Sequence, residues 1–209
     1  MKVIIFGATG TIGRQVVTQA LEEGHQVTAF SRHPKKLAMN RENLQLFAGD
    51  VMDNTTVEQA IQGQDAVVCV LGSGKKLFGN VRSEGTRNII QAMEKTGVRR
   101  LICQSTLGAG DSWSNLDFYW KYVMFGFILR KVFADHLIQE AFVEQSQLDW
   151  TIVRPGAFTK GDRTGNYRHG FPAGDRDITL TISASDVADF ILKQLTSNTY
   201  IGETPALSY

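Results

Sequence analysis

The chain opens with MKVIIFGATGTIG, residues 1–13, in which a short apolar run leads into three evenly spaced glycines. The apolar run is typical of a buried strand, and residues 14–23 have the periodicity of a helix. Gly7 would make the tight turn, Gly10 would let the backbone approach a pyrophosphate, and Gly13 would let the helix pack closely on the strand. The helix N-terminus offers N–H groups to a phosphate. This altered dinucleotide-binding motif, G-x-x-G-x-x-G, predicts dinucleotide binding, with a purely structural glycine turn as the alternative.

Beyond this opening, strand-like and helix-like segments alternate to the end of the chain. Further strands are expected at residues 26–31, 44–48, 65–71, 100–104, 150–154 and 178–182, and further helices at 54–62, 82–96, 113–145 and 183–195. The alternation predicts the α/β class, with a single Rossmann-like doubly wound parallel sheet and helices on both faces. No interdomain linker interrupts the pattern, so residues 1–209 are expected to form one NAD(P)-binding domain.

Composition excludes several classes of protein. The 209 residues are 43% hydrophobic and 21% charged, and the formal net charge of +1 gives no reason to expect nucleic acid as a partner. Cys69 and Cys103 lie in apolar runs that predict reduced core thiols, and no Cys/His spacing indicates a metal. We expect no transmembrane segment, because the uncharged run 122–129 is too short to span a bilayer. Without a signal peptide in this sequence, a cytoplasmic protein is expected.

The carboxyl ends of the expected strands carry the candidate cofactor residues. Arg32 follows the second strand, where a basic residue accommodates the 2′-phosphate of NADP, so NADP(H) is the predicted cofactor. A solvated basic helix start is the alternative, and it suits Lys35 and Lys36 better than Arg32. Residues 71–76 lack the glycine and hydroxyl of a phosphate loop and are expected to be a ligand-facing loop at a strand end. Ser105 ends the fifth strand and would bind substrate or cofactor, or cap a turn.

Two segments outside this framework are unusual. Residues 113–133 are rich in aromatic side chains, more than the core face of a long helix explains. The surplus would line an acceptor pocket, mediate self-association, or contact a partner or a membrane surface. Residues 157–177 are rich in Gly, Arg and Asp without periodicity, which predicts a substrate loop.

The chain resembles the flavin reductase / biliverdin-IXβ reductase family, within the NmrA-like group of atypical short-chain dehydrogenases/reductases. The resemblance covers nearly the whole chain. It rests on Phe6-Gly7-Ala8-Thr9-Gly10, Gly49-Asp50-Val51, Gly63-Gln64-Asp65-Ala66-Val67, Leu71-Gly72, Ser83-Glu84-Gly85-x-Arg87-Asn88-Ile89, Ser105, Asp135-His136 and Thr164-Gly165-x-Tyr167.

The resemblance implies a cofactor site and an activity. Arg32 would hold the 2′-phosphate, and Ser105 would lie beside the nicotinamide. The pyrophosphate would contact Gly7, Thr9, Gly10, Thr11 and Ile12, the adenine end Asp50 and Val51, and the ribose side Leu71 and Gly72. Members of the family transfer hydride from NADPH to flavins and open-chain tetrapyrroles, which implies a small aromatic acceptor as substrate.

Two departures from the wider pattern bear on mechanism. No tyrosine has a lysine four residues on, and the histidine that the family often shows after the sixth strand is absent from residues 155–158. Without a Tyr/Lys pair a ketone would lack a positioned proton donor, whereas a flavin, tetrapyrrole or quinone delocalises the product charge. His136 is a candidate proton donor, or else a surface or helix-stabilising histidine. Trp120, Phe158 and Arg154 are candidate acceptor contacts, with a structural ion pair as the alternative for Arg154.

Two functions follow from these observations. The first is an NADPH-dependent reductase of a flavin or another conjugated acceptor. The second is a non-catalytic NADP(H)-binding regulatory or assembly protein, for which the aromatic segment 113–133 would be the contact surface, at a membrane or elsewhere.

Overall fold

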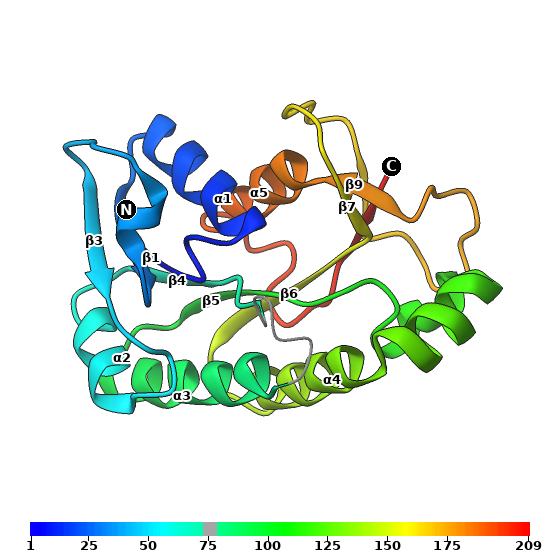
Figure 1. Cartoon of the computed structure of the whole chain (residues 1–209), viewed down its shortest axis with the longest axis horizontal. Helices are drawn as coiled ribbons and strands as arrows, with labels where there is room; N and C mark the ends of the chain where they lie inside the picture. The colour runs from blue at the N-terminus through cyan, green and yellow to red at the C-terminus, as the bar shows by residue number, and fades with distance from the viewer. Residues whose placement is uncertain (73–78) are drawn as a thin grey trace.

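The computed structural model describes residues 1–72 and 79–209, and within them an eight-stranded sheet forms the centre of the molecule (Figure 1). The strand order is β3-β2-β1-β4-β5-β6-β10-β8, and every described pair in this sheet is parallel except β8 with β10. The strands are β1 Lys2–Phe6, β2 Gln26–Ser31, β3 Leu44–Ala48, β4 Ala66–Cys69, β5 Arg100–Gln104, β6 Asp149–Pro155, β8 Arg168–His169 and β10 Ala206–Ser208. The doubly wound α/β fold expected from the alternation is therefore confirmed.

Helices cover both faces of this sheet. In Figure 1, α1 and α5 lie on one face, and α2, α3 and α4 lie on the other. Their bounds are α1 Thr11–Glu22, α2 Asn54–Ile61, α3 Val81–Thr96, α4 Arg130–Glu144 and α5 Ala184–Lys193. Alternate side chains of β1 enter the two resulting cores, Val3 and Ile5 on one side and Ile4 and Phe6 on the other. Both faces are buried, which explains the continuous apolar runs of the central strands.

The aromatic segment differs from the single long helix expected there. A 3₁₀-helix, η2 (Gly110–Asn115), is followed by a π-helix, η3 (Tyr119–Ile128), and then by α4. The Leu129 N–H donates to the carbonyl of Met124 at 2.6 Å, the wide spacing of a π-helix. The wider turn rotates successive side chains differently from an α-helix, so the apolar residues do not share one core-facing stripe. No helix of the described residues is long and apolar enough to cross a membrane.

Residues 157–177 contain short strands that the sequence pattern does not show. β7 (Ala157–Thr159) pairs in parallel with β9 (Thr181–Ser183) in a separate two-stranded sheet, and β8 pairs with β10. The strand expected at 178–182 is therefore wrong over its first three residues, and β10 was missed. Strands of two or three residues are too short to show an alternating pattern, and they exist because a partner lies beside them.

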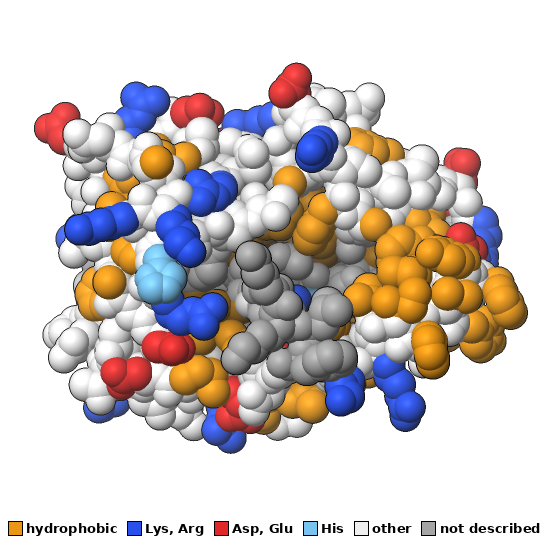
Figure 2. Space-filling model, in the orientation of Figure 1, with side chains coloured by type: hydrophobic (Ala, Val, Ile, Leu, Met, Phe, Trp, Pro, Cys, Tyr) orange, Lys and Arg blue, Asp and Glu red, His pale blue; other side chains and the backbone are white. Residues whose placement is uncertain are grey.

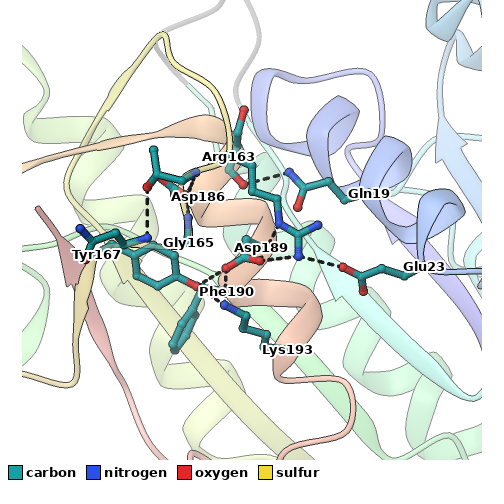
Figure 3. A network of polar contacts seen from close by, with 12 residues as sticks. Gln19, Glu23, Arg163, Gly165, Tyr167, Asp186, Asp189, Phe190 and Lys193 are labelled. Carbon is teal, nitrogen blue, oxygen red and sulfur yellow. Dashed lines mark hydrogen bonds and ion pairs between the residues drawn. The ribbon is translucent and has the colours of Figure 1, made fainter.

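Asp186, at the start of α5, holds the middle of this segment in place (Figure 3). Its Oδ1 accepts hydrogen bonds from the N–H groups of Thr164 and Gly165 at 2.8 and 2.9 Å. Its Oδ2 accepts from the Tyr209 hydroxyl at 2.6 Å. Burial favours protonation of Asp186, but the hydrogen bonds from Tyr209, Gly165 and Thr164 outweigh it and lower the pKa of the carboxyl group.

Asp189, one turn further along α5, adds a second anchor. Its carboxylate accepts from Arg163 Nε at 2.7 Å, from Lys193 Nζ at 2.6 Å and from the Tyr167 hydroxyl. Arg163 also contacts Glu23, beside the end of α1, at 3.1 Å (Figure 3). The exposed segment between Arg163 and Tyr167 is therefore attached to the helices of one face.

Candidate cofactor and acceptor site

The glycine turn after β1 has the geometry of a phosphate-binding turn. Gly7 has a φ of +86°, and a Cβ there would lie 2.3 Å from the carbonyl oxygen of Val70. A Cβ at Gly13 would lie 2.2 Å from the carbonyl oxygen of Gly7, whereas one at Gly10 would meet, among the described residues, only that same oxygen, at 3.2 Å. Gly7 and Gly13 are thus required for packing, while the space outside Gly10 is open.

The start of α1 is available to an anion. Gly10 is its N-cap, and no side chain of the described residues caps it. The first N–H groups of a helix have no partner within the helix, so a pyrophosphate fits the donors present here. The roles expected for Gly7, Thr9, Gly10, Thr11 and Ile12 in pyrophosphate binding stay a prediction.

The other candidate cofactor residues follow neighbouring strands at the same edge of the sheet. β1 lies between β2 and β4, and β5 follows β4. Parallel strands have their carboxyl ends at one edge, so the residues that follow them are brought together there. These residues are Arg32 after β2, Asp50 and Val51 after β3, Leu71 and Gly72 after β4, and Ser105 after β5. The remainder of the predicted loop 71–76, from residue 73, lies outside the described residues.

The polar groups at this edge differ in whether they already have partners. The Arg32 side chain is exposed. Asp50 Oδ1 accepts from the Met52 N–H at 3.0 Å and so stabilises its own turn, and the Val51 carbonyl accepts from Asn88 Nδ2 at 3.0 Å. Arg32 is therefore free to approach a 2′-phosphate, whereas Asp50 and Val51 have structural contacts as well.

A cavity of about 200 Å³ lies beside this edge and is mostly apolar. Four residues singled out from the sequence line it, and each comes from a different part of the fold: Ser105 after β5, Trp120 from η3, His136 from α4 and Phe158 from β7. The other lining residues are Arg82, Gln104, Thr106, Leu107, Leu116, Phe125, Leu129, Val132, Pro155, Gly156, Ala157 and Leu180. Concave apolar sites with a few polar groups are typical of small-molecule binding.

Ser105 is positioned by the strand register. Its N–H donates to the Val153 carbonyl at 2.8 Å, which continues the β5–β6 pairing by one residue. Its side chain is buried, yet Oγ has no hydrogen-bond partner among the described residues. Buried hydroxyl groups are normally paired, so this one is available to a ligand in the cavity.

His136 is buried in the wall of the cavity, so the alternative of a surface histidine is wrong. Burial, followed by the nearby positive charge of Arg82, lowers the pKa of His136 to about 3, although the Gln139 hydrogen bond raises it. Its Nδ1 lies 3.2 Å from Gln139 Oε1. The imidazole is consequently neutral at pH 7, which makes it a poor proton donor.

Arg154 forms ion pairs with two carboxylates. Its Nε and Nη2 donate to the two carboxylate oxygens of Glu140 at 3.0 and 2.8 Å, and its Nη1 contacts Asp111 at 2.6 Å. It is not among the described residues that line the cavity. Of the two interpretations of Arg154, the structure favours the ion pair, which ties β6 to α4 and η2.

Cys69 and Cys103 are register partners on β4 and β5, and both are buried free thiols, as expected. Their proximity does not create a metal site. Over residues 1–72 and 79–209, no group of three or more His, Cys, Asp or Glu side chains could hold a metal ion.

Arg82 is the cavity residue that the sequence analysis missed. It lies in the first turn of α3, where a positive charge is unfavourable next to the helix dipole. This unfavourable position was the signal in the sequence that could have identified Arg82, because a positive charge there suggests a role other than stabilising the helix.

Comparison with known proteins agrees with this fold. A profile of the NAD(P)H-binding family matches residues 7–198. The chain therefore belongs to the NAD(P)H-binding family, and NAD(P)H is its cofactor.

Three proteins illustrate the range of the relatives. The photosystem II assembly factor Ycf39 of Synechocystis is 26% identical over 204 residues, which cover 92% of this chain but only 58% of the relative. The oxidoreductase ylbE of Lactococcus lactis has a TM-score of 0.84 at 25% identity, over 100% of this chain and 90% of that one. ChuY, an anaerobillin reductase of Escherichia coli, has a TM-score of 0.80 at 25% identity, over 100% and 97% of the two chains.

Proposed function

We propose that the protein is an NADPH-dependent reductase that transfers hydride to a flavin or another conjugated acceptor, such as a linear tetrapyrrole or a quinone. One observation carries the proposal: an apolar, aromatic-walled cavity adjoins Ser105 at the carboxyl edge of the sheet. The ylbE and ChuY structures, described as an oxidoreductase and a reductase, support it.

The side chains of the cavity suit an acceptor whose reduction depends on ring stacking and not on a protein acid or base. Bound NADPH would supply the hydride. Trp120 and Phe158 would stack on the acceptor, and Ser105 Oγ would orient the reacting rings. Neutral His136 would hydrogen-bond to the acceptor. Because little His136 is protonated at pH 7, the proton that completes the reduction would come from solvent.

Arg32 would select NADPH over NADH. Its exposed guanidinium follows β2, where the 2′-phosphate of NADP lies in this fold. Replacing it by glutamate would repel the 2′-phosphate and accept the 2′-hydroxyl group of NADH instead.

The first prediction tests this proposal by NADPH oxidation. Purified protein would be offered FMN, a quinone and biliverdin separately, with NADH and Arg32→Glu as controls. We expect turnover with at least one acceptor, and a loss of about tenfold or more in NADPH affinity in the variant, the size of one charge-assisted contact. Tight NADPH binding without oxidation of any acceptor would contradict the reductase function.

The alternative function is a non-catalytic NADP(H)-binding assembly protein, and a surface feature favours it. Figure 2 shows apolar side chains gathered at the end of the molecule that carries η3. We call them the aromatic face: Phe118, Tyr119, Tyr122, Phe127 and Ile128, all exposed, with Phe127 at 84%. Ycf39, named as an assembly factor, is a relative. This function predicts protein association through the aromatic face without NADPH turnover.

A further inference from the structure

Arg82 brings a buried cation to the wall of the cavity that Ser105 and His136 share. Its side chain is only 12% exposed. Its Nε and Nη1 atoms are buried and have no hydrogen-bond partner among residues 1–72 and 79–209. Buried guanidinium donors are normally paired, so these two atoms lack a partner that a ligand could supply.

The nearest carboxylate does not satisfy Arg82. Asp135 Oδ2 lies 3.9 Å from Arg82 Nη1, beyond hydrogen-bond distance. The same carboxylate accepts from the N–H groups of Arg82 and Ser83, each at 3.2 Å, and from Ser83 Oγ at 2.5 Å. Asp135 thus caps the start of α3, and its oxygens are largely used by that helix.

No other described residue around the cavity offers a negative charge. Apart from Arg82 and the neutral His136, the described lining consists of apolar side chains and of Gln104, Ser105, Thr106 and Gly156. It includes no aspartate or glutamate. Burial lowers the pKa of Arg82, while the charge of Asp135 opposes that effect, and a guanidinium remains protonated at neutral pH. The cavity wall therefore carries a positive charge that Asp135, at 3.9 Å, balances only in part, and two donor atoms of Arg82 have no hydrogen-bond partner among the described residues.

We propose that Arg82 binds an anionic group, a carboxylate or a phosphate, of the acceptor that enters this cavity. The inference rests on the proposed function only in taking the ligand to be the hydride acceptor. The guanidinium group is a planar fork of donors that matches the two oxygens of either anion. Arg82 would thus determine specificity, favouring an acidic acceptor over its neutral analogue.

The test uses ligand pairs in which one member carries an anionic group that the other lacks. FMN and riboflavin differ by a phosphate, and biliverdin and its dimethyl ester differ by two carboxylates, so the pairs distinguish the two anions. The variant is Arg82→Met, which keeps an unbranched side chain without the guanidinium group and leaves the backbone N–H groups of α3 that bond Asp135 in place. The control is Arg87→Met on the same helix, whose guanidinium is 48% exposed and paired with Glu84.

We expect the wild-type protein to prefer the charged member of at least one pair by about tenfold or more in kcat/KM. Arg82→Met should lose that preference, because its kcat/KM for the charged ligand falls by a larger factor than its kcat/KM for the neutral ligand. Arg82→Lys should keep part of the preference, and Arg87→Met should behave as wild type. Equal values for both members of each pair in the wild type would overturn the proposal.

Equilibrium binding separates this inference from the reductase function. If no acceptor is reduced, the reductase proposal fails, but the same ligand pairs can be titrated against the NADP-bound protein through the fluorescence of Trp120 and its neighbours. Charge-selective binding that Arg82→Met abolishes would still support the anion site. No binding of either charged ligand, or a loss of NADPH affinity in Arg82→Met as large as the loss for the charged ligand, would overturn it.

Discussion

Gly10 and Gly13 are three residues apart, but a methyl group would meet different surroundings at each. At Gly13 the backbone of α1 lies against the carbonyl oxygen of Gly7, and a Cβ would approach it to 2.2 Å. At Gly10 the same oxygen would be 3.2 Å away, and no other atom of residues 1–72 and 79–209 is within 4 Å. Gly10 therefore leaves room for a ligand, and Gly13 permits the helix to pack against the strand.

The second prediction compares alanine at these two positions. Gly13→Ala should destabilise the fold by about 1–3 kcal/mol or more, because rigid backbone must move to admit the methyl group. Gly10→Ala should cost less stability but weaken NADPH binding, because the methyl group occupies the approach of the pyrophosphate. Urea denaturation and NADPH titration of both variants measure the two effects, and equal stability losses would contradict this division of roles.

Arg154 and Arg82 also have distinct roles. Arg154 is neutralised by Glu140 and Asp111, whereas Arg82 retains unpaired donors. The two arginines differ in the carboxylates that the fold places beside them. The amino-acid type alone does not predict this difference.

At the scale of elements, the acidic residues of α5 determine the path of residues 157–177. Asp186 and Asp189 attach the stretch from Arg163 to Tyr167 to the helix, while Phe158, near the beginning of the segment, lines the cavity. A role of this segment as a substrate loop stays a prediction. The structure places its contact with the cavity at Phe158 and its attachment further along.

The third prediction concerns Asp186→Asn. The amide would keep one oxygen for the N–H groups of Thr164 and Gly165 but would turn an NH₂ donor toward the hydroxyl groups of Tyr209 and Thr164, so we expect a loss of about 1–3 kcal/mol in the free energy of unfolding near pH 7. The folded-state pKa of Asp186 is lowered, so its stabilisation is fully present above the unfolded pKa of about 3.9 and is lost as pH falls through the folded pKa. The variant should therefore show a shallower acid decline in stability.

Urea denaturation at several pH values measures this effect. Asp162→Asn, an exposed residue of the same segment, is the matched control and should retain the wild-type pH dependence. An Asp186→Asn variant with wild-type stability at both ends of the pH range would refute the anchoring role.

At the scale of the whole molecule, the aromatic face lies at the end of the longest axis that carries η3 (Figures 1 and 2). The formal net charge of +1 presents little repulsion between copies of the chain. We propose that two copies associate through the aromatic face. Such contact would remove large apolar side chains from water, the main driving force of protein association.

The fourth prediction is that Phe118→Ser combined with Phe127→Ser weakens self-association, because these side chains are 73% and 84% exposed. Sedimentation at several protein concentrations measures the effect, and NADPH affinity should be unchanged because neither residue lines the cavity within the described part. Leu46→Ser, at an exposed position on β3, is the control. A wild-type protein that is monomeric at every concentration would refute the contact.

Local sequence patterns were sufficient for the framework of this protein. The strands at 26–31, 44–48 and 100–104 match β2, β3 and β5, and the glycine turn leads into α1 as expected. These features follow from apolar periodicity and from the backbone freedom of glycine, which act over a few residues. Ser105, Trp120, His136 and Phe158 were each identified from the sequence on separate grounds.

Only the tertiary structure decided how these residues combine. It brought the four of them to one cavity, added Arg82, and paired Arg154 with carboxylates. It also produced the π-helix and the short strands β7, β8 and β10, for which the sequence has no periodic signal. The physical reason is that these outcomes depend on neighbours far away along the chain, because hydrogen-bond partners, charges and cavity walls are supplied by packing and not by local propensity.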